Sequence, residues 1–155
     1  MNILEIPVIG NRRNDIEKFY SLLSDQPLRK FEGLDVGYLH LENSIAIYFY
    51  FLDQENEDYF YLWDLIIPHA IGCVVLCDMG NSEIFEKNVE TIERLKKSYH
   101  TPLHICSFPV DGETVVELPV NAEQEFLYFD PQDKESVKTI LLKVLDSIEQ
   151  KNQTS

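Results

Sequence analysis

The chain has few cysteines and no long apolar run, and each shortage excludes a class of protein. Its 155 residues include three cysteines, an odd number, and each lies in an apolar stretch. We therefore expect reduced core thiols in a cytoplasmic protein rather than a disulfide framework. No apolar run approaches the roughly 18 residues of a membrane span, and no charged-then-apolar leader opens the sequence, so we expect neither a span nor a signal peptide.

Basic residues are also scarce. The chain has 13 Lys and Arg against 27 Asp and Glu, which gives a formal net charge of −14. This charge repels nucleic acid and anionic membranes and gives no help to a site for a free triphosphate. It permits basic protein partners, although solubility alone would also account for it.

Signatures of metal sites and of nucleophilic catalysis are absent. The four histidines show no metal-binding spacing, and Cys73 and Cys77 have no paired Cys/His cluster beside them. The acidic loop 53–58 could hold a hard cation, but it lacks the glycine and the spacing of a calcium loop. With no Ser/His/Asp or Cys/His signature either, we predict no catalytic residue, no metal and no cofactor.

The chain does contain strand-like runs that alternate with amphipathic helical runs, in one domain over residues 1–150 with a frayed tail at 151–155. Strands are predicted at 3–9, 34–41, 44–52, 71–78, 103–108 and 126–129. Helices are predicted from Asn14 or Asp15 to about Ser24, over 59–67, from Asn81 or Ser82 to about Ser98, and over 130–150. Residues 25–33 are predicted to be a polar connection.

This alternation predicts an α/β fold, with a mostly parallel sheet of five or six strands and helices on both faces. The hairpin of residues 34–52 would place one antiparallel strand at an edge. The element order is that of Ras-like small GTPases. A receiver or flavodoxin type of domain is an alternative, but its all-parallel sheet does not fit the hairpin.

Three collinear stretches resemble the bacterial gliding-motility (Mgl-type) GTPases. Residues 34–39, LDVGYL, are similar to the family's L-D-[FY]-G-R-[IL], which opens its second strand. Residues 59–78, YFYLWDLIIPHAIGCVVLCD, resemble F-x-[FM]-x-W-D-x-L-x-x-G-A-x-G-x-V-V-L-V-D. Residues 130–145, DPQDKESVKTILLKVL, are similar to D-A-R-D-R-E-S-V-K-x-V-L-L-x-L-L. The resemblance implies a Ras-like domain with sheet order 2-3-1-4-5-6.

The phosphate loop of that family, G-x-x-x-x-G-K-[ST], would begin at Gly10, and its last three positions are altered. Asp15 replaces the second glycine, Ile16 replaces the lysine that neutralises phosphate, and Glu17 replaces the hydroxyl that binds Mg²⁺. Arg12 and Arg13 could supply positive charge from this turn, or they could simply be exposed beside the start of a helix.

The other nucleotide motifs are altered as well. Residues 25–33 contain no threonine for a first switch. At the second switch, Glu55 replaces the glycine whose N–H would meet the γ-phosphate, and Asn56 replaces the glutamine that positions water. At the guanine motif, Phe108 replaces the asparagine. Asp111 is kept, either as a guanine ligand or as a turn residue before Gly112. In the loop beside guanine, Pro131 removes a backbone donor.

These losses predict a pseudo-GTPase, a non-catalytic Ras-like scaffold that acts through protein contacts and does not bind GTP. The alternative is an atypical small GTPase that uses Arg12, Arg13, Glu17 and Asp111 and still binds, or slowly hydrolyses, a guanine nucleotide.

Aromatic residues offer a candidate surface for a protein partner. Alternate residues of a strand face opposite sides, so either the pair 48/50 or the pair 49/51 can lie away from the core, unless helices cover both faces. The candidate partner-binding residues are Tyr38, His40, Tyr48, Tyr50, Tyr59 and Tyr61. The resemblance implies a partner of the Roadblock type, a dimer, and a homodimer of this chain is the other possibility. We expect no nucleic-acid or membrane partner.

Overall fold

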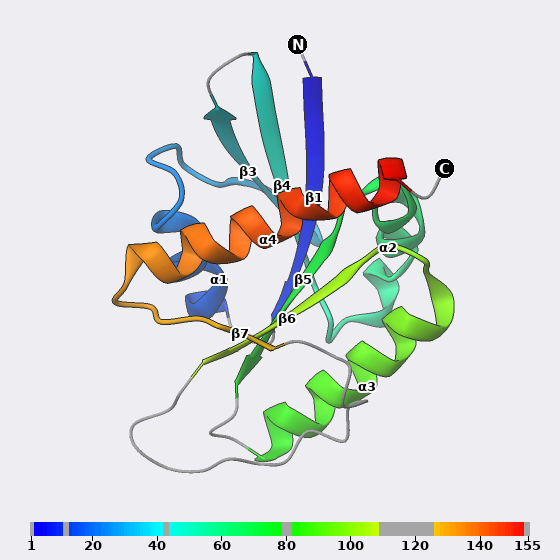
Figure 1. Cartoon of the computed structure of the whole chain (residues 1–155). Coiled ribbons are helices and arrows are strands. Elements are labelled where there is room, and N and C mark those ends of the chain that lie inside the picture. Colours follow the sequence, from blue (N-terminus) through cyan, green and yellow to red (C-terminus); the bar gives the residue numbers. More distant parts are fainter. Residues whose placement is uncertain (1, 11–12, 42–43, 79–81, 109–125, 154–155) are drawn as a thin grey trace.

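The computed structural model describes residues 2–10, 13–41, 44–78, 82–108 and 126–153, and within them seven strands form one sheet (Figure 1). The strands are β1 (Asn2–Gly10), β2 (Arg29–Phe31), β3 (Leu34–Leu41), β4 (Ile45–Leu52), β5 (Cys73–Asp78), β6 (Leu103–Phe108) and β7 (Phe126–Tyr128). The helices are α1 (Arg13–Ser21), α2 (Tyr61–Ile66), α3 (Ser82–Ser98) and α4 (Lys134–Gln153), with single 3₁₀ turns η1 (Glu57–Tyr59) and η2 (Ile67–His69) on either side of α2.

The sheet order is β2-β3-β4-β1-β5-β6-β7. All neighbouring strands from β4 to β7 pair in parallel, while β3 is antiparallel to both β2 and β4. The predicted α/β fold with a mostly parallel sheet and the hairpin of β3 and β4 are therefore confirmed. An all-parallel sheet of receiver or flavodoxin type is excluded.

One strand more than the predicted five or six is present. The strand β2 was expected to be part of a polar connection, and without it the sheet order is the predicted 2-3-1-4-5-6. All three of its residues are exposed. Its sequence, Arg-Lys-Phe, has no alternation of apolar and polar residues that would predict a strand. It forms by pairing across a tight turn, in which Gly33 has a φ of +76°. The antiparallel strand β3 consequently lies one strand in from the edge.

Helices pack on both faces of the sheet and divide the core in two. On one face, α1 and α4 bury a cluster that includes Phe19, Phe49, Phe129 and Ile140. On the other face, α2, η2 and α3 bury a second cluster, whose larger members include Trp63, Ile67, Phe85, Ile92 and Leu95. This is the three-layer arrangement expected for strands whose sequences are almost continuously apolar.

Three helices begin at other residues than predicted. Helix α2 begins at Tyr61, because Tyr59 still belongs to η1. Helix α1 begins at Arg13, so Asn14 and Asp15 belong to its first turn instead of preceding it. Helix α4 begins at Lys134 rather than Asp130, because the Asp133 carboxylate accepts the N–H of Glu135 (3.0 Å) and caps the helix there. Helix α4 extends to Gln153. In the described part of the chain, no helix combines the length and apolar character needed to cross a membrane.

Candidate functional site

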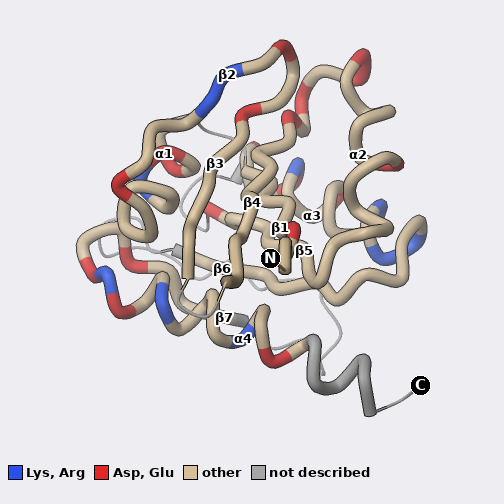
Figure 2. The backbone as a smooth tube through the Cα atoms, turned by 90° about the horizontal axis from the view of Figure 1, so that it is seen from above, with Lys and Arg blue, Asp and Glu red and all other residues tan. Residues whose placement is uncertain are grey.

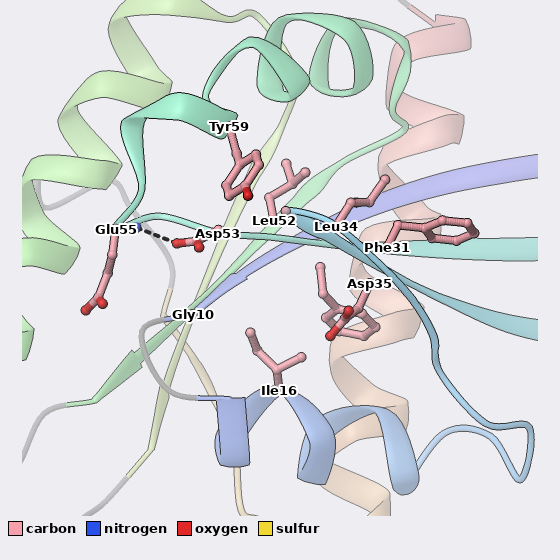
Figure 3. Close-up of a pocket in the computed structure, with 11 residues that line it drawn as sticks. Gly10, Ile16, Phe31, Leu34, Asp35, Leu52, Asp53, Glu55 and Tyr59 are labelled. Carbon is pink, nitrogen blue, oxygen red and sulfur yellow. Dashed lines mark hydrogen bonds between the residues drawn. The ribbon is translucent and has the colours of Figure 1, made fainter.

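The candidate site lies at the carboxyl ends of β1 and β4, next to the start of α1. This is the edge of a parallel sheet where α/β proteins bind ligands. A pocket of about 260 Å³ opens there (Figure 3). Its lining comprises Gly10, Ile16, Phe31, Gly33, Leu34, Asp35, Phe51, Leu52, Asp53, Glu55 and Tyr59. These described residues include three carboxylates and no lysine or arginine. A phosphate-binding site needs positive charge or free N–H donors instead.

Ile16, at the position that the resemblance gives to a phosphate-binding lysine, makes an apolar contact. A Cβ added to Gly10 would lie 3.4 Å from the Cγ1 atom of Ile16, so the isoleucine reaches back over the end of β1. The side chain is half-buried and packs against the core cluster under α1. Ile16 therefore places an apolar side chain against the end of β1, at the point where a nucleotide-binding domain needs a cation.

The Asp53 carboxylate satisfies the backbone donors of the loop after β4. Its Oδ1 accepts the N–H of Glu55 at 2.7 Å and the N–H of Asn56 at 3.2 Å. The resemblance would have the N–H at position 55 meet a γ-phosphate. Here an intramolecular carboxylate takes that donor, and Figure 3 shows the contact as a dashed line. Sequence reasoning missed this role of Asp53, although an aspartate that accepts from two residues ahead is a common local turn signal.

Glu55 and Asn56 also make contacts of their own. The Glu55 carboxylate lies 3.5 Å from the Nζ of Lys87 on α3, an exposed ion pair. The Asn56 side-chain oxygen accepts the N–H of Asp58 (3.0 Å) and caps η1. Neither side chain is arranged to position a water molecule over the pocket, because each is engaged with its own loop or with α3.

Tyr59 joins the β2–β3 turn to the loop before α2. Its ring lies so close to Gly33 that a Cβ on the glycine would overlap the ring carbons. Its hydroxyl donates to the Glu32 carboxylate (3.0 Å), and this hydrogen bond raises the pKa of Tyr59. The β2–β3 turn and the segment before α2 are thus held together by contacts within the protein.

The acidic residues of α1 lie beside the pocket rather than in it. Asp15 and Glu17 border a separate surface depression with Asn14, Lys18 and Ser21. Asp15 stands in the first turn of α1, where negative charge is favoured, and Glu17 follows in the next turn. These two carboxylates would repel a phosphate bound at this helix start. The side chains of Arg12, Arg13, Phe108 and Asp111 lie outside the described residues.

The loop beside the expected guanine site also closes on itself. The Asp130 carboxylate accepts the N–H of Gln132 (2.9 Å), and the Asp130 N–H donates to the hydroxyl of Ser136 (3.0 Å). The carboxylate and the backbone N–H of Asp130 therefore both help to join β7 to α4.

Four of the six predicted partner-binding residues come together on one face of the sheet. Tyr38 and His40 of β3 and Tyr48 and Tyr50 of β4 form a continuous row of rings. Their centroids are 6.4 Å apart for 38/40, 5.4 Å for 38/48 and 6.4 Å for 48/50. Phe49 and Phe51 point to the opposite face, into the core under α1, so the pair 48/50 is the one outside the main core.

The remaining two candidates lie apart from this row. Tyr59 packs on Gly33, as described above. Tyr61 is exposed on α2, and Leu65 lies one turn further along the same helix and is also exposed. Helix α2 is tied to the end of α3 by the Tyr99 hydroxyl, which donates to the Asp64 carboxylate at 2.5 Å.

A second groove, between α2 and α3, was not predicted from the sequence. The guanidinium of Arg94 lies 4.2 Å from the ring centroid of Phe60 and 5.1 Å from that of Trp63. Trp63 in turn donates its ring N–H to the carbonyl of Asp53 (3.2 Å). No sequence signal links these residues, because the arginine is distant in the chain and sits on the polar face of its helix.

The described residues offer no metal centre and no reactive thiol. No group of three or more His, Cys, Asp or Glu among them could hold a metal ion. The three cysteines are buried and unpaired with one another. Burial raises the pKa of Cys73 to about 12 and that of Cys77 to about 11, and it raises the pKa of Cys106 as well. The prediction of reduced core thiols agrees with this burial.

Comparison with known proteins identifies no relative. The sequence matches no protein-family model. It also matches none of the curated proteins searched.

Proposed function

We propose that this protein is a pseudo-GTPase, a degenerate Ras-like domain that works by binding other proteins and does not bind or hydrolyse GTP. The observation that carries the proposal is the hydrogen bond from the N–H of Glu55 to the carboxylate of Asp53. The resemblance requires the N–H at position 55 to donate to a γ-phosphate, whereas here it donates to the Asp53 carboxylate. A phosphate would have to displace this carboxylate and then lie beside it.

Electrostatics in the pocket support the same proposal. Two like unit charges about 4 Å apart repel by about 4 kcal/mol at an effective dielectric constant near 20. Asp35, Asp53 and Glu55 all line the pocket. Lys87 offsets part of the charge of Glu55, and Ile16 supplies no compensating charge. A triphosphate would therefore be disfavoured here even with Mg²⁺ bound to it.

A role in protein binding agrees with the contacts between the two segments that correspond to the switches. In nucleotide-dependent switches, γ-phosphate and Mg²⁺ order these segments. Here Tyr59 holds the β2–β3 turn through contacts within the protein, to Gly33 and Glu32. We infer that the surface around these segments has one fixed shape for a partner. The resemblance suggests a Roadblock-type dimer, and a second copy of this chain is the other candidate.

Calorimetry tests the proposal directly. The protein is purified without added nucleotide, and GTP, GDP and ATP are titrated with Mg²⁺ present. We expect no heat of binding for any of them at concentrations up to about 1 mM, a free energy weaker than about 4 kcal/mol. Micromolar, Mg²⁺-dependent binding of a guanine nucleotide would instead favour the atypical GTPase.

A further inference from the structure

The ring cluster on β3 and β4 continues onto β1 and forms an ordered patch. Parallel and antiparallel pairing place three rows side by side across the strands: Val36, Tyr50 and Pro7; Tyr38, Tyr48 and Glu5; and His40, Ala46 and Ile3. The Tyr50 hydroxyl donates to the Glu5 carboxylate (3.0 Å) and fixes the two side chains together. We call the accessible part of this patch, Ile3, Glu5, Tyr38, His40, Tyr48 and Tyr50, the tyrosine face.

The tyrosine face is open although the sheet around it is covered. It lies on the same side of the sheet as α2 and α3, beyond the part that those helices cover. Figure 1 shows the amino end of β1 and the adjoining ends of β3 and β4 projecting beyond the helices. Ile3 is 54% exposed, and the three tyrosines are half-buried. Since sheets of this class are normally covered by helices on both faces, this patch lacks its usual cover among the described elements.

Charge is distributed unevenly between this side of the molecule and the rest. The stretch from Leu34 to Asp78 contains no lysine or arginine, and β1 contains none either. The same stretch contains eight acidic residues: Asp35, Glu42, Asp53, Glu55, Glu57, Asp58, Asp64 and Asp78. Figure 2 shows basic residues on β2, α1, α3 and α4, whereas the charged residues of β1, β3 and α2 are all acidic and β4 has no Lys, Arg, Asp or Glu. The strands that carry the tyrosine face therefore bring no lysine or arginine to it, and Glu5 places a carboxylate within it.

A partner strand is a poor occupant of this region. Beyond the end of β2, the edge of β3 is closed at Tyr38, whose N–H donates to the hydroxyl of Tyr20 (3.0 Å). The carbonyl of Tyr38 accepts from the hydroxyl of Ser24 (2.7 Å). With its backbone groups taken, β3 cannot extend the sheet at this residue.

A second copy of this chain is also a poor occupant. It would bring together two molecules that each have a net charge of −14. Anionic membranes and nucleic acids are disfavoured for the same reason.

We propose that the tyrosine face binds an amphipathic helix of a partner protein that carries lysine and arginine around its apolar stripe. The apolar stripe covers the tyrosine rings, and the cations stack on the ring faces and pair with Glu5. This deepens the protein-binding role proposed above and rests on it.

Defined peptides test the proposal. The probe is a helical peptide of about 18 residues, about five turns, with leucine on one stripe and lysine and arginine elsewhere. A matched peptide keeps the leucines and has glutamate in place of the cations, and a third keeps the composition but scrambles the stripe. Fluorescence anisotropy gives the affinity of each, and amide chemical shifts of labelled protein locate the bound peptide.

We expect the cationic helix to bind at least about tenfold more tightly than either control peptide, with affinity falling as salt is raised. Amide shifts should gather on β1, β3 and β4. The double variant Tyr38→Ser/Tyr48→Ser should weaken binding about tenfold or more. Tyr128→Ser is the matched control, since Tyr128 is exposed on β7 at the far side of the sheet. Glu5→Lys should also weaken binding and changes no core residue, so it tests the same surface if the double variant does not fold.

Three results would overturn the proposal: no binding of the cationic helix, equal binding of the acidic helix, or amide shifts confined to another surface. Sedimentation that shows a dimer abolished by Tyr38→Ser/Tyr48→Ser would also overturn it, in favour of a second copy. Because none of these experiments contains nucleotide, their failure is distinguishable from a failure of the calorimetric test above.

Discussion

The ring of Tyr59 lies against the backbone of Gly33, 26 positions earlier in the chain, and leaves no room for a side chain on the glycine. Gly33 also has a φ of +76°, which side chains other than glycine rarely adopt. Two independent constraints, one steric and one conformational, therefore require glycine at this turn. Together they join the β2–β3 turn to the segment that leads into α2.

The substitution Gly33→Ala should destabilise the fold by about 2 kcal/mol, because it adds both backbone strain and a clash with Tyr59. Urea unfolding measures the loss. The double variant Gly33→Ala/Tyr59→Ala should lose less than the sum of the two single changes, since the clash is gone while the strain remains. Gly10→Ala is the control, because a Cβ there meets its nearest neighbours at an ordinary 3.4 Å. Strictly additive losses would contradict the contact.

Removing the Asp53 carboxylate should loosen the loop after β4. In Asp53→Ala, the N–H groups of Glu55 and Asn56 lose their acceptor, at a cost of about 1 kcal/mol in unfolding free energy. Hydrogen exchange at these two amides should accelerate relative to wild type. Asp53→Asn keeps an acceptor oxygen and should retain most of the protection. Unchanged exchange in the alanine variant would show that the carboxylate does not hold the loop.

Tyr50 should ionise well above an ordinary tyrosine. Burial, with a smaller contribution from the hydrogen bond to Glu5, raises its pKa from 10.0 to about 12. Between these pH values the unfolded chain has released the proton and the folded chain has not, so folding stability falls as pH rises through this window. NMR titration of the labelled ring measures the value. Glu5→Gln should lower it only part of the way, because burial remains. No change in Glu5→Gln would contradict the role given to the carboxylate.

The three cysteines should be unreactive in the folded protein. At pH 8 a thiol with a pKa near 11 or 12 carries almost no thiolate, which is the nucleophilic form. We expect no reaction with a disulfide reagent in buffer and three equivalents after unfolding in urea. Rapid labelling of the native protein would show that the strands β5 and β6 open easily.

Much of the fold was predictable because its signals are local. The hairpin of β3 and β4 and the strand β5 carry apolar patterns that need no knowledge of distant residues. The strand β2 could not be predicted, since Arg29, Lys30 and Phe31 are all exposed and are ordered by pairing with β3. The start of α4 was placed too early because Asp130 and Asp133 are both good caps, and the first closes its own turn.

The sequence predicted the candidate site mainly as a set of departures from a nucleotide-binding motif. The altered residues Ile16 and Glu55 stand out in the sequence because a motif is expected there. What replaces the lost contacts was not predictable to the same degree. The contact of Tyr59 with Gly33 and the stacking of Arg94 on Phe60 join segments that are far apart in the chain, so only the folded structure reveals them.

The triple substitution Asp15→Gly, Ile16→Lys and Glu17→Thr should not restore GTP binding, although it rewrites the turn after β1 as a phosphate loop. The new lysine would still meet a pocket lined by Asp35, Asp53 and Glu55, and the N–H of Glu55 would still be taken by Asp53. Adding Asp53→Ala frees that donor but leaves the other two carboxylates, so we expect no binding there either. Calorimetry with GTP and Mg²⁺ measures both variants, with circular dichroism to confirm that each is folded. Micromolar binding by the triple variant would mean that the turn alone had been lost and that the rest of a nucleotide site had been kept.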